Sequence, residues 1–332
     1  MRKYAYIIII FVVGSLILEL LLTLAFMYKD RHLVPLNVRD HPYLYYSFKS
    51  GENLNEDGFK TNSNIHKAQG TYRIILTGGS VARSAGPLEN SIASFLEKIL
   101  NRALTGKNIE IVNAGVSGYV VQQEFLLTQM VLQKYNADMI ISLSGFNDVF
   151  TIHRNNFSPT FDIAPPHNWK NFKVIEMNRF KKSVLYRLAG IYKSFFRIYH
   201  YYKFNSGADV DPDYEKLSSI YWNTTDDIAD LTSAKGIRYF HFVQPARDLG
   251  EEKIFGDERL NVLFENIISR TNSIDYAFDL SNVFENRKKH FTDYCHLDVE
   301  GNEILAEEMA KILLPLINHD PEFFELAKAQ KN

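Results

Sequence analysis

The sequence lacks the features that mark several common classes of protein. Its 332 residues include one cysteine, Cys295, so an internal disulfide is impossible and the redox compartment stays open. The 37 lysines and arginines do not outnumber the 39 aspartates and glutamates, so no overall basic charge favours nucleic acid as a partner. Internal repeats, low-complexity tracts and His, Cys, Asp and Glu groups with metal-ligand spacing are also absent. What remains is a chain with 46% hydrophobic residues, enough for one large globular domain or two small ones.

The longest hydrophobic run lies at the N-terminus. Residues 4–27 read YAYIIIIFVVGSLILELLLTLAFM, in which Glu19 is the only charged residue. About 20 apolar residues cross a bilayer, whereas a cleaved signal peptide has about 7–15 before a cleavage site between small residues. This run is longer and has no such site, which predicts an uncleaved transmembrane signal anchor; a long buried core helix is the alternative. Arg2 and Lys3 precede the run, so residues 1–3 are predicted to be cytoplasmic and the body extracytoplasmic.

The rest of the chain predicts a short lead-in followed by an α/β domain. Residues 28–70 have little apolar periodicity and are predicted to be a stalk and lead-in, with the aromatic patch 43–46 docked on the body. From residue 71 short apolar runs alternate with amphipathic segments, which favours parallel strands joined by right-handed helical crossovers. Within this domain, 71–332, residues 151–215 interrupt the alternation and are predicted to be an insertion. The predicted strands are 71–79, 109–115, 138–145, 236–245 and 277–281, and the predicted helices are 91–103, 123–135, 214–235, 260–271 and 300–314, the last of which is expected to stop at Pro315.

A glycine turn ends the first predicted strand, in RIILTGGSVARSAG (73–86). Open α/β sheets place their sites at the carboxyl ends of such strands. The turn is not a Walker loop, which would need a second glycine at Ser84 and a following Lys-Ser or Lys-Thr. It is not a dinucleotide fingerprint, which would need glycines at Ser80 and Arg83, and it differs from the G-x-S-x-G elbow because residue 82 is alanine. Taken alone, Ser80 is either a nucleophile or an ordinary turn serine.

Three motifs further along the chain favour the nucleophile. VNAGVSGYV places Gly118 after the second strand, LSGFNDV places Asn147 after the third, and DYCH places Asp293 and His296 before the last helix. If the strands are parallel, all of these residues lie at the same edge of the sheet. Acyl transfer needs such a set, because Ser80 can attack, His296 can accept its proton and Asp293 can orient the imidazole. The Gly118 N–H and the Asn147 amide can donate to the developing oxyanion.

These motifs resemble the four sequence blocks of the SGNH hydrolase superfamily, also called GDSL-type esterases, and in particular its membrane-anchored bacterial branch. Gly78-Gly79-Ser80 corresponds to the first block, which is usually Gly-Asp-Ser, and Gly118 matches the second. The third block matches Gly145-Phe146-Asn147-Asp148, and the last matches Asp293-Tyr294-Cys295-His296. The resemblance covers residues 71 to about 317, and the glycine at position 79 is a departure from its pattern.

The resemblance implies a fold and a site. The implied fold has three layers, α/β/α, with about five parallel strands. The implied oxyanion hole consists of the Ser80 N–H, the Gly118 N–H and the side chain of Asn147. Neither a metal ion nor an organic cofactor is implied, and the implied substrate is an ester.

Other chemically active residues have simpler interpretations. Asp148 is interpreted as a helix cap or a brace for its loop, and Cys295 as a small packed residue rather than a nucleophile. The basic and aromatic run 179–204 predicts an amphipathic helix packed on the body, a segment lying on the membrane surface, or the wall of a sugar-binding cleft. Four histidines have no clear partner in the sequence and are interpreted as ordinary surface or core residues: His153, His167, His200 and His241.

The sequence therefore predicts a membrane-anchored serine esterase that acts outside the cytoplasm. The expected substrates are O-acyl groups, especially O-acetyl groups, on envelope or exported polysaccharide. A polysaccharide O-acyltransferase would use the same triad, and a non-catalytic glycan-binding or assembly protein would keep the fold without the chemistry. The presence of Ser80, Asp293 and His296 argues against the last alternative.

Overall fold

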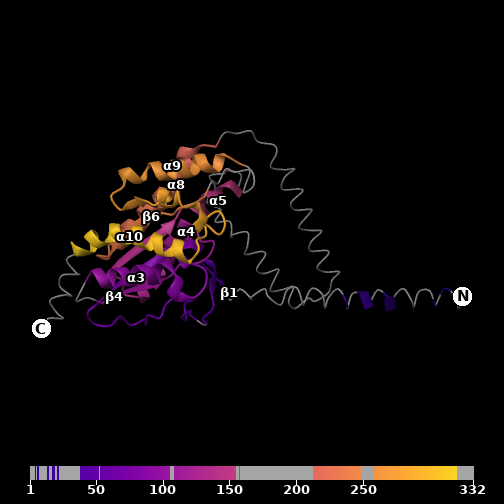
Figure 1. The fold of residues 1–332 in the computed structure, drawn as a ribbon, viewed down its shortest axis with the longest axis horizontal. Coiled ribbons are helices and arrows are strands. Elements are labelled where there is room, and N and C mark those ends of the chain that lie inside the picture. The colour runs from indigo at the N-terminus through magenta and orange to yellow at the C-terminus, as the bar shows by residue number, and fades with distance from the viewer. Residues whose placement is uncertain are drawn as a thin grey trace. The chain divides into compact units, whose positions relative to one another are not determined.

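A computed structural model describes two units of the chain (Figure 1). One unit comprises Met1–Leu36 and His167–Asp211, and its seven described residues, between Tyr4 and Leu21, are helical. The other comprises Asn37–Pro166 and Pro212–Asn332 and contains a sheet with the helices that cover it. The described residues are 38–51, 53–104, 108–154, 157, 212–247 and 257–319, together with Tyr4, Tyr6, Val13, Gly14, Ile17, Leu18 and Leu21.

Within the described residues, the second unit is built on a five-stranded parallel sheet. Its strands are β3 (Thr71–Gly78), β4 (Asn108–Asn113), β5 (Met139–Ser144), β6 (Arg238–Val243) and β7 (Ala277–Asp279), arranged in the order β4-β3-β5-β6-β7. All neighbouring pairs are parallel. β3 and β5 are buried along their whole length, as expected for central strands covered on both faces. The chain leaves β3 for the edge strand β4 and returns on the other side of β3, so the strand order reverses beside β3.

Helices cover both faces of the sheet and produce three layers. α3 (Ile92–Ala103) packs against α10 (Val299–Asn318) on one face, whereas α4 (Val121–Lys134) and α9 (Arg259–Ser269) pack against α8 (Tyr214–Ser233) on the other (Figure 1). The predicted three-layer fold with about five parallel strands is thereby confirmed. The shorter helices are α2 (Ser80–Arg83), α5 (Phe146–Arg154), η1 (Leu88–Asn90), η2 (Thr271–Ser273), η3 (Ser281–Phe284) and η4 (Lys288–His290).

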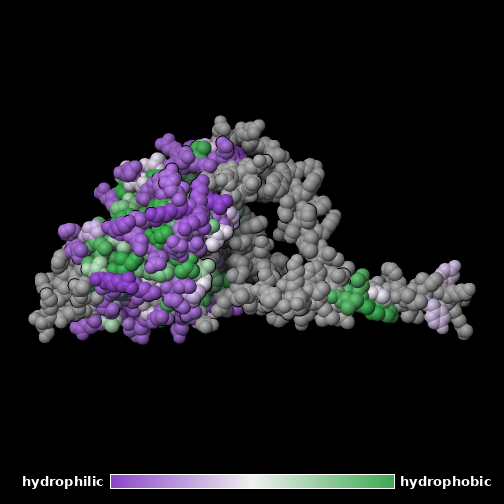
Figure 2. Space-filling model, in the orientation of Figure 1, coloured by the Kyte–Doolittle hydropathy of each residue, from purple (hydrophilic) through white to green (hydrophobic). Residues whose placement is uncertain are grey.

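The core lies between the sheet and these helices. Among the described residues, the largest wholly buried side chain is Trp222 of α8, whose indole N–H donates to the carbonyl of Ile267 in α9 at 3.2 Å. This bond satisfies the polar atom of a side chain that otherwise only packs. The visible face of the unit is mostly hydrophilic (Figure 2), and the apolar side chains of the sheet and its covering helices are buried in the core.

The lead-in belongs to the compact unit from residue 38 onward. β1 (Val38–His41) and β2 (Tyr45–Phe48) form an antiparallel hairpin. Of the aromatic patch 43–46, Leu44 and Tyr46 are buried, whereas Tyr43 and Tyr45 stay exposed. Further along, the Lys60 N–H donates to the carbonyl of Asn113 at 2.9 Å, which attaches the lead-in to the end of β4. From residue 38 onward, the described part of the lead-in therefore packs on the sheet domain.

One predicted helix end is wrong. α10 does not stop at Pro315 but continues to Asn318. Proline removes one helical hydrogen bond and crowds the preceding turn, which is why a stop was expected. Tertiary contacts outweigh this cost: Leu313 and Ile317 are wholly buried on one face, and Arg238 donates to the Leu316 carbonyl at 2.5 Å. The other predicted strands and helices of the sheet domain appear with their ends shifted by a few residues.

Two predicted segments lie mostly outside the described residues. They are the transmembrane anchor, 4–27, and the insertion, 151–215, with its basic and aromatic run 179–204. At the described ends of the insertion, α5 runs on to Arg154 and α8 begins at Tyr214. In the part of the chain that the structure describes, no helix combines the length and the apolar character needed to cross a membrane.

Arg73 of β3 joins the lead-in to the sheet, and this attachment can be tested by mutation. Its wholly buried guanidinium donates to the carbonyls of Asn64, Ile65 and Tyr135 at 2.7–2.8 Å and pairs with Glu110. Arg73→Leu leaves these acceptors without a donor, so we expect it to lower the free energy of unfolding by about 3 kcal/mol.

Urea denaturation monitored by tryptophan fluorescence measures this loss. The matched control is Arg102→Leu, at an exposed position of α3, which should change the unfolding free energy by less than about 0.5 kcal/mol. Equal losses in the two variants would show that Arg73 does not anchor the lead-in.

Candidate active site

Ser80 lies at the start of α2, directly after β3. Gly78 makes this turn possible, because its φ of +139° is a conformation that side chains rarely allow. A Cβ at Gly78 would also lie 2.4 Å from the carbonyl oxygen of Leu143. The chain therefore turns sharply from the strand into the helix and presents a partly exposed Ser80 at the carboxyl end of the sheet.

The imidazole of His296 joins Ser80 to Asp293. Its Nε2 lies 2.6 Å from Ser80 Oγ, and its Nδ1 lies 2.6 Å from Asp293 Oδ2. Because an ionised carboxylate only accepts, Nδ1 of neutral His296 carries the proton and Nε2 accepts from the serine hydroxyl. The structure thus brings together the three residues that the sequence suggested, although Ser80 and His296 are 216 positions apart.

Both carboxylate oxygens of Asp293 are engaged. Oδ1 accepts from the N–H groups of Cys295 at 2.9 Å and His296 at 2.8 Å, while Oδ2 faces the imidazole. Burial by itself would raise the pKa of Asp293, but these hydrogen bonds and the His296 ring hold it below its ordinary value. The carboxylate is therefore ionised at neutral pH and can stabilise a positive imidazolium.

The predicted oxyanion donors gather at the end of β3. The N–H groups of Ser80 and Gly118 have no acceptor among the residues that the structure describes. The loop containing Gly118 is tied to β3 because the Val116 N–H donates to the Gly78 carbonyl at 2.9 Å. Asn147 donates one hydrogen of its amide to the Tyr119 carbonyl at 2.8 Å, which leaves its second hydrogen available. Their role as an oxyanion hole stays a prediction.

The space beside Asn147 explains the glycine at position 79. A Cβ at Gly79 would lie 2.2 Å from Asn147 Nδ2 and 3.5 Å from the carbonyl oxygen of Tyr119. The φ of Gly79 is −84°, so space rather than backbone conformation excludes a side chain here. In this chain the amide of Asn147 packs directly against the backbone of the serine turn.

A buried carboxyl group that the sequence analysis did not single out supports the ends of β3 and β5. Glu124 of α4 is wholly buried and accepts hydrogen bonds from the hydroxyls of Thr77 at 2.9 Å, Ser142 at 2.5 Å and Ser144. Burial raises the pKa of Glu124, and the three hydroxyl groups oppose this shift. The signal in the sequence was a set of hydroxyl side chains within otherwise apolar strands, as in MIISLS (139–144).

The sequence analysis interpreted Asp148, Cys295 and four histidines as structural residues, and those that the structure describes have structural contacts. Asp148 accepts from the Val121 N–H at 2.9 Å, so it caps α4 from a distant position. His241 is wholly buried between the hydroxyls of Tyr221 and Tyr239, at 2.5 and 3.0 Å, and burial lowers its pKa to about 3. It is therefore a neutral core histidine.

His153 and Cys295 are also structural residues. His153 Nε2 lies 3.1 Å from Asp257 Oδ2. Cys295 is buried, and burial together with Asp293 raises the pKa of its thiol, so it stays protonated. His167 and His200 lie outside the described residues.

Although the sequence showed no group with metal-ligand spacing, the fold brings one such group together among the described residues. Ligand atoms of Asp293, Cys295 and His296 lie within 4.8 Å of one another. The donor set does not fit a metal ion, because a histidine ligand needs an imidazole nitrogen that is free to coordinate. His296 has none to offer, since its Nδ1 faces Asp293 Oδ2 and its Nε2 faces Ser80 Oγ, each at 2.6 Å.

Comparisons with known proteins find similarity at the level of structure. No family model matches the sequence, and no curated protein matches it. Similar solved structures include a lipolytic protein of the G-D-S-L family from Veillonella parvula, with 13% identity, a TM-score of 0.42, and coverage of 73% of this chain and 97% of that one. The acetyl xylan esterase AlAXEase has 14% identity, a TM-score of 0.45, and coverage of 72% and 98%. An acetylxylan esterase from Geobacillus stearothermophilus has 14% identity, a TM-score of 0.43, and coverage of 72% and 93%.

The contact between Gly79 and Asn147 predicts the effect of adding one methyl group. Gly79→Ala should displace the Asn147 amide and slow ester turnover by about 10²–10³-fold, the usual effect of losing one oxyanion donor. The measurement is kcat/KM for p-nitrophenyl acetate in Gly79→Ala, Asn147→Ala and the double variant.

The double variant is the internal control for this prediction. Because both changes remove the same donor, it should be no slower than the slower single variant. Losses that multiply in the double variant would mean that the two residues act separately.

Proposed function

We propose that the protein is a serine esterase in which Ser80, His296 and Asp293 form the catalytic triad. The observation that carries this proposal is the continuous line of hydrogen bonds from Ser80 Oγ through the imidazole to Asp293, with both steps 2.6 Å long. Nucleophilic catalysis needs a base within hydrogen-bond reach of the nucleophile and a third group that orients the base. The three side chains meet both conditions.

The proposed reaction has two stages. His296 Nε2 takes the hydroxyl proton as Ser80 Oγ attacks the ester carbonyl, and the N–H groups of Ser80 and Gly118 with the Asn147 amide stabilise the oxyanion. The tetrahedral intermediate collapses, and His296 gives the proton to the departing alcohol. Water then attacks the acyl-enzyme with His296 again as the base, which releases the acid and restores the hydroxyl. Asp293 remains ionised throughout and stabilises the imidazolium.

Hydrolysis is the outcome that the surroundings of the triad favour. The side chains of His296 and Asp293 are 34% and 39% exposed. Transfer of the acyl group to a sugar hydroxyl needs water to be kept away from the acyl-enzyme. Among the described residues the triad is open to water, which favours an esterase over an acyltransferase.

The proposed substrate and location rest on the sequence. The apolar run 4–27 supports a single-pass anchor in the cell membrane, with the catalytic domain outside the cytoplasm. The resemblance to membrane-anchored SGNH hydrolases supports O-acyl groups, especially O-acetyl groups, on envelope or exported polysaccharide as the substrates. No part of the proposed mechanism uses a metal ion or an organic cofactor.

Covalent labelling tests the triad. A fluorophosphonate should form an adduct on Ser80, detected by peptide mass spectrometry, and Ser80→Ala should abolish it. His296→Ala should slow labelling by about 10³-fold or more, because the serine loses its base. Cys295→Ala is the matched control, since it changes a buried neighbour of His296 that has no proposed role, and it should label like the wild type.

Two results would refute the triad. One is an adduct on a residue other than Ser80, and the other is equal labelling of the wild type and His296→Ala. A chain that binds glycan but is neither labelled nor active on p-nitrophenyl acetate would establish the non-catalytic alternative.

Product analysis tests the substrate class and the fate of the acyl group. We expect the full-length chain to release acetate from an O-acetylated polysaccharide, with an equal loss of O-acetyl signals in the proton NMR spectrum, and Ser80→Ala to release none. The same reaction is repeated with an unacetylated acceptor glycan. Appearance of O-acetyl groups on the acceptor in place of free acetate would identify an acyltransferase.

A further inference from the structure

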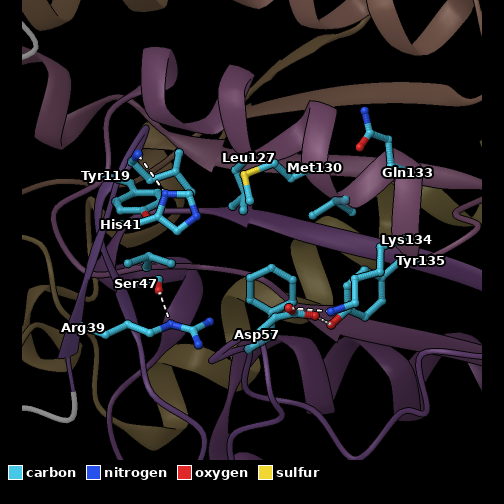
Figure 3. Close-up of a pocket in the computed structure, with 14 residues that line it drawn as sticks. Arg39, His41, Ser47, Asp57, Tyr119, Leu127, Met130, Gln133, Lys134 and Tyr135 are labelled. Carbon is cyan, nitrogen blue, oxygen red and sulfur yellow. Dashed lines mark hydrogen bonds and ion pairs between the residues drawn. The ribbon is translucent and has the colours of Figure 1, made fainter.

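A cavity that is separate from the triad lies between the N-terminal hairpin and α4 (Figure 3). Its volume is about 300 Å³, at the lower end of the range for small-molecule sites, and none of the three triad residues lines it. One wall comes from β1, β2 and the segment 57–59, and the opposite wall comes from the second half of α4. This cavity has room for one small molecule.

The interior of the cavity is apolar. Eight of its side chains are at most 7% exposed, and five of these are hydrocarbon throughout: Leu44, Phe59, Val116, Leu127 and Val131. Met130 is 40% exposed and lies at the opening. An apolar floor beneath an open mouth suits the hydrocarbon body of a ligand.

The charges at the rim do not balance. On the α4 side, Lys134 and Asp57 neutralise each other at 2.7 Å. On the β1 side, the Arg39 guanidinium donates only to uncharged acceptors, Ser47 Oγ at 2.9 Å and the Glu56 carbonyl at 3.2 Å. Among the described residues no carboxylate pairs with Arg39, so one positive charge at the rim is uncompensated.

His41 supplies a second donor beside Arg39. Its Nδ1 accepts from the N–H groups of Tyr43 at 3.3 Å and Leu44 at 3.1 Å, so the proton of the neutral ring is on Nε2. Burial and the nearby Arg39 lower the pKa of His41. The ring nitrogen that carries the proton faces the cavity (Figure 3).

The tyrosines of the cavity argue against a sugar as its occupant. The hydroxyl of Tyr119 donates to the Tyr46 carbonyl at 2.5 Å, and that of Tyr135 donates to Asp57 at 2.5 Å. Both residues are 1% exposed, so they offer neither a free hydroxyl nor an open ring face. A sugar, which needs several polar partners and a stacking face, would find few of either here.

We propose that this cavity binds a small amphipathic anion, with a single alkyl or acyl chain on the apolar floor and a carboxylate or phosphate head at Arg39 and His41. The planar guanidinium matches either head group, and the neutral imidazole adds one N–H donor. The cavity also shares a wall with the proposed active site. Tyr119 lines the cavity, and its carbonyl accepts from the Asn147 amide. The proposal does not depend on the triad being catalytic.

Isothermal titration calorimetry of the full-length chain in lipid nanodiscs tests the proposal, with empty nanodiscs as the background for partitioning. The probes are hexyl phosphate, hexanoate, hexanol and inorganic phosphate. We expect saturable binding of at least one of the two amphipathic anions, and weaker binding of hexanol and of inorganic phosphate, which each lack one half of the ligand. The anion that binds more tightly identifies the head group.

Variants at two exposed positions test the head-group site and the apolar floor separately. Arg39→Gln should weaken binding of the preferred anion by about tenfold or more, since a charge-assisted hydrogen bond is lost, while Arg39→Lys should weaken it less. Met130→Trp should block the opening and abolish binding. Lys235→Gln, at an exposed position just after α8 that does not line the cavity, is the control and should leave binding unchanged. Thermal unfolding at the wild-type midpoint verifies that each variant is folded.

Three results would overturn the proposal. They are no binding of either anion above the background, equal binding by wild type and Arg39→Gln, and equal binding by wild type and Met130→Trp. A cavity that another segment of the chain itself fills would also give the first result, because neither anion could then bind. Because calorimetry needs no turnover, an inactive triad would leave this test intact.

Discussion

The parallel arrangement of β3 between β4 and β5 is the constraint on which the candidate site depends. Parallel strands end at the same edge of a sheet, so the segments that follow β3, β4 and β5 meet there. Ser80, Gly118 and Asn147 stand in these three segments. His296 comes from a fourth segment, and its 2.6 Å bond to Ser80 closes the site across 216 positions of sequence. A sheet with any of these strands reversed would separate the donors from the nucleophile.

Buried polar groups hold these strand ends in place. A carboxyl group inside a protein is costly unless it is hydrogen-bonded, and Glu124 meets this requirement only where hydroxyls of β3 and β5 converge. Asp148 fixes the start of α4 in a similar way, by accepting from the Val121 N–H. These directional bonds fix the ends of the strands in addition to the close packing of the apolar core. Because Ser80 directly follows β3, the bonds that hold the end of this strand also help to hold Ser80 in position.

The N-terminal hairpin contacts the same region of the fold. The Tyr46 hydroxyl donates to the Ser117 carbonyl, and the Tyr119 hydroxyl donates back to the Tyr46 carbonyl. The hairpin thus clamps the loop that contains Gly118. Its other face, with Arg39 and His41, forms a wall of the cavity beside α4. One short segment before the sheet therefore supports the proposed oxyanion loop and builds the proposed anion site.

The sequence by itself determined the alternation of strands and helices and the four motifs of the site. These features depend on near neighbours: periodicity sets the strands, and the spacing Asp-x-x-His places Asp293 and His296 on one turn. Only the tertiary structure decided the role of Glu124, the close approach of Asn147 to Gly79 and the continuation of α10 through Pro315. Each of these depends on atoms contributed by distant segments, because burial and hydrogen bonding across the fold outweigh local preference.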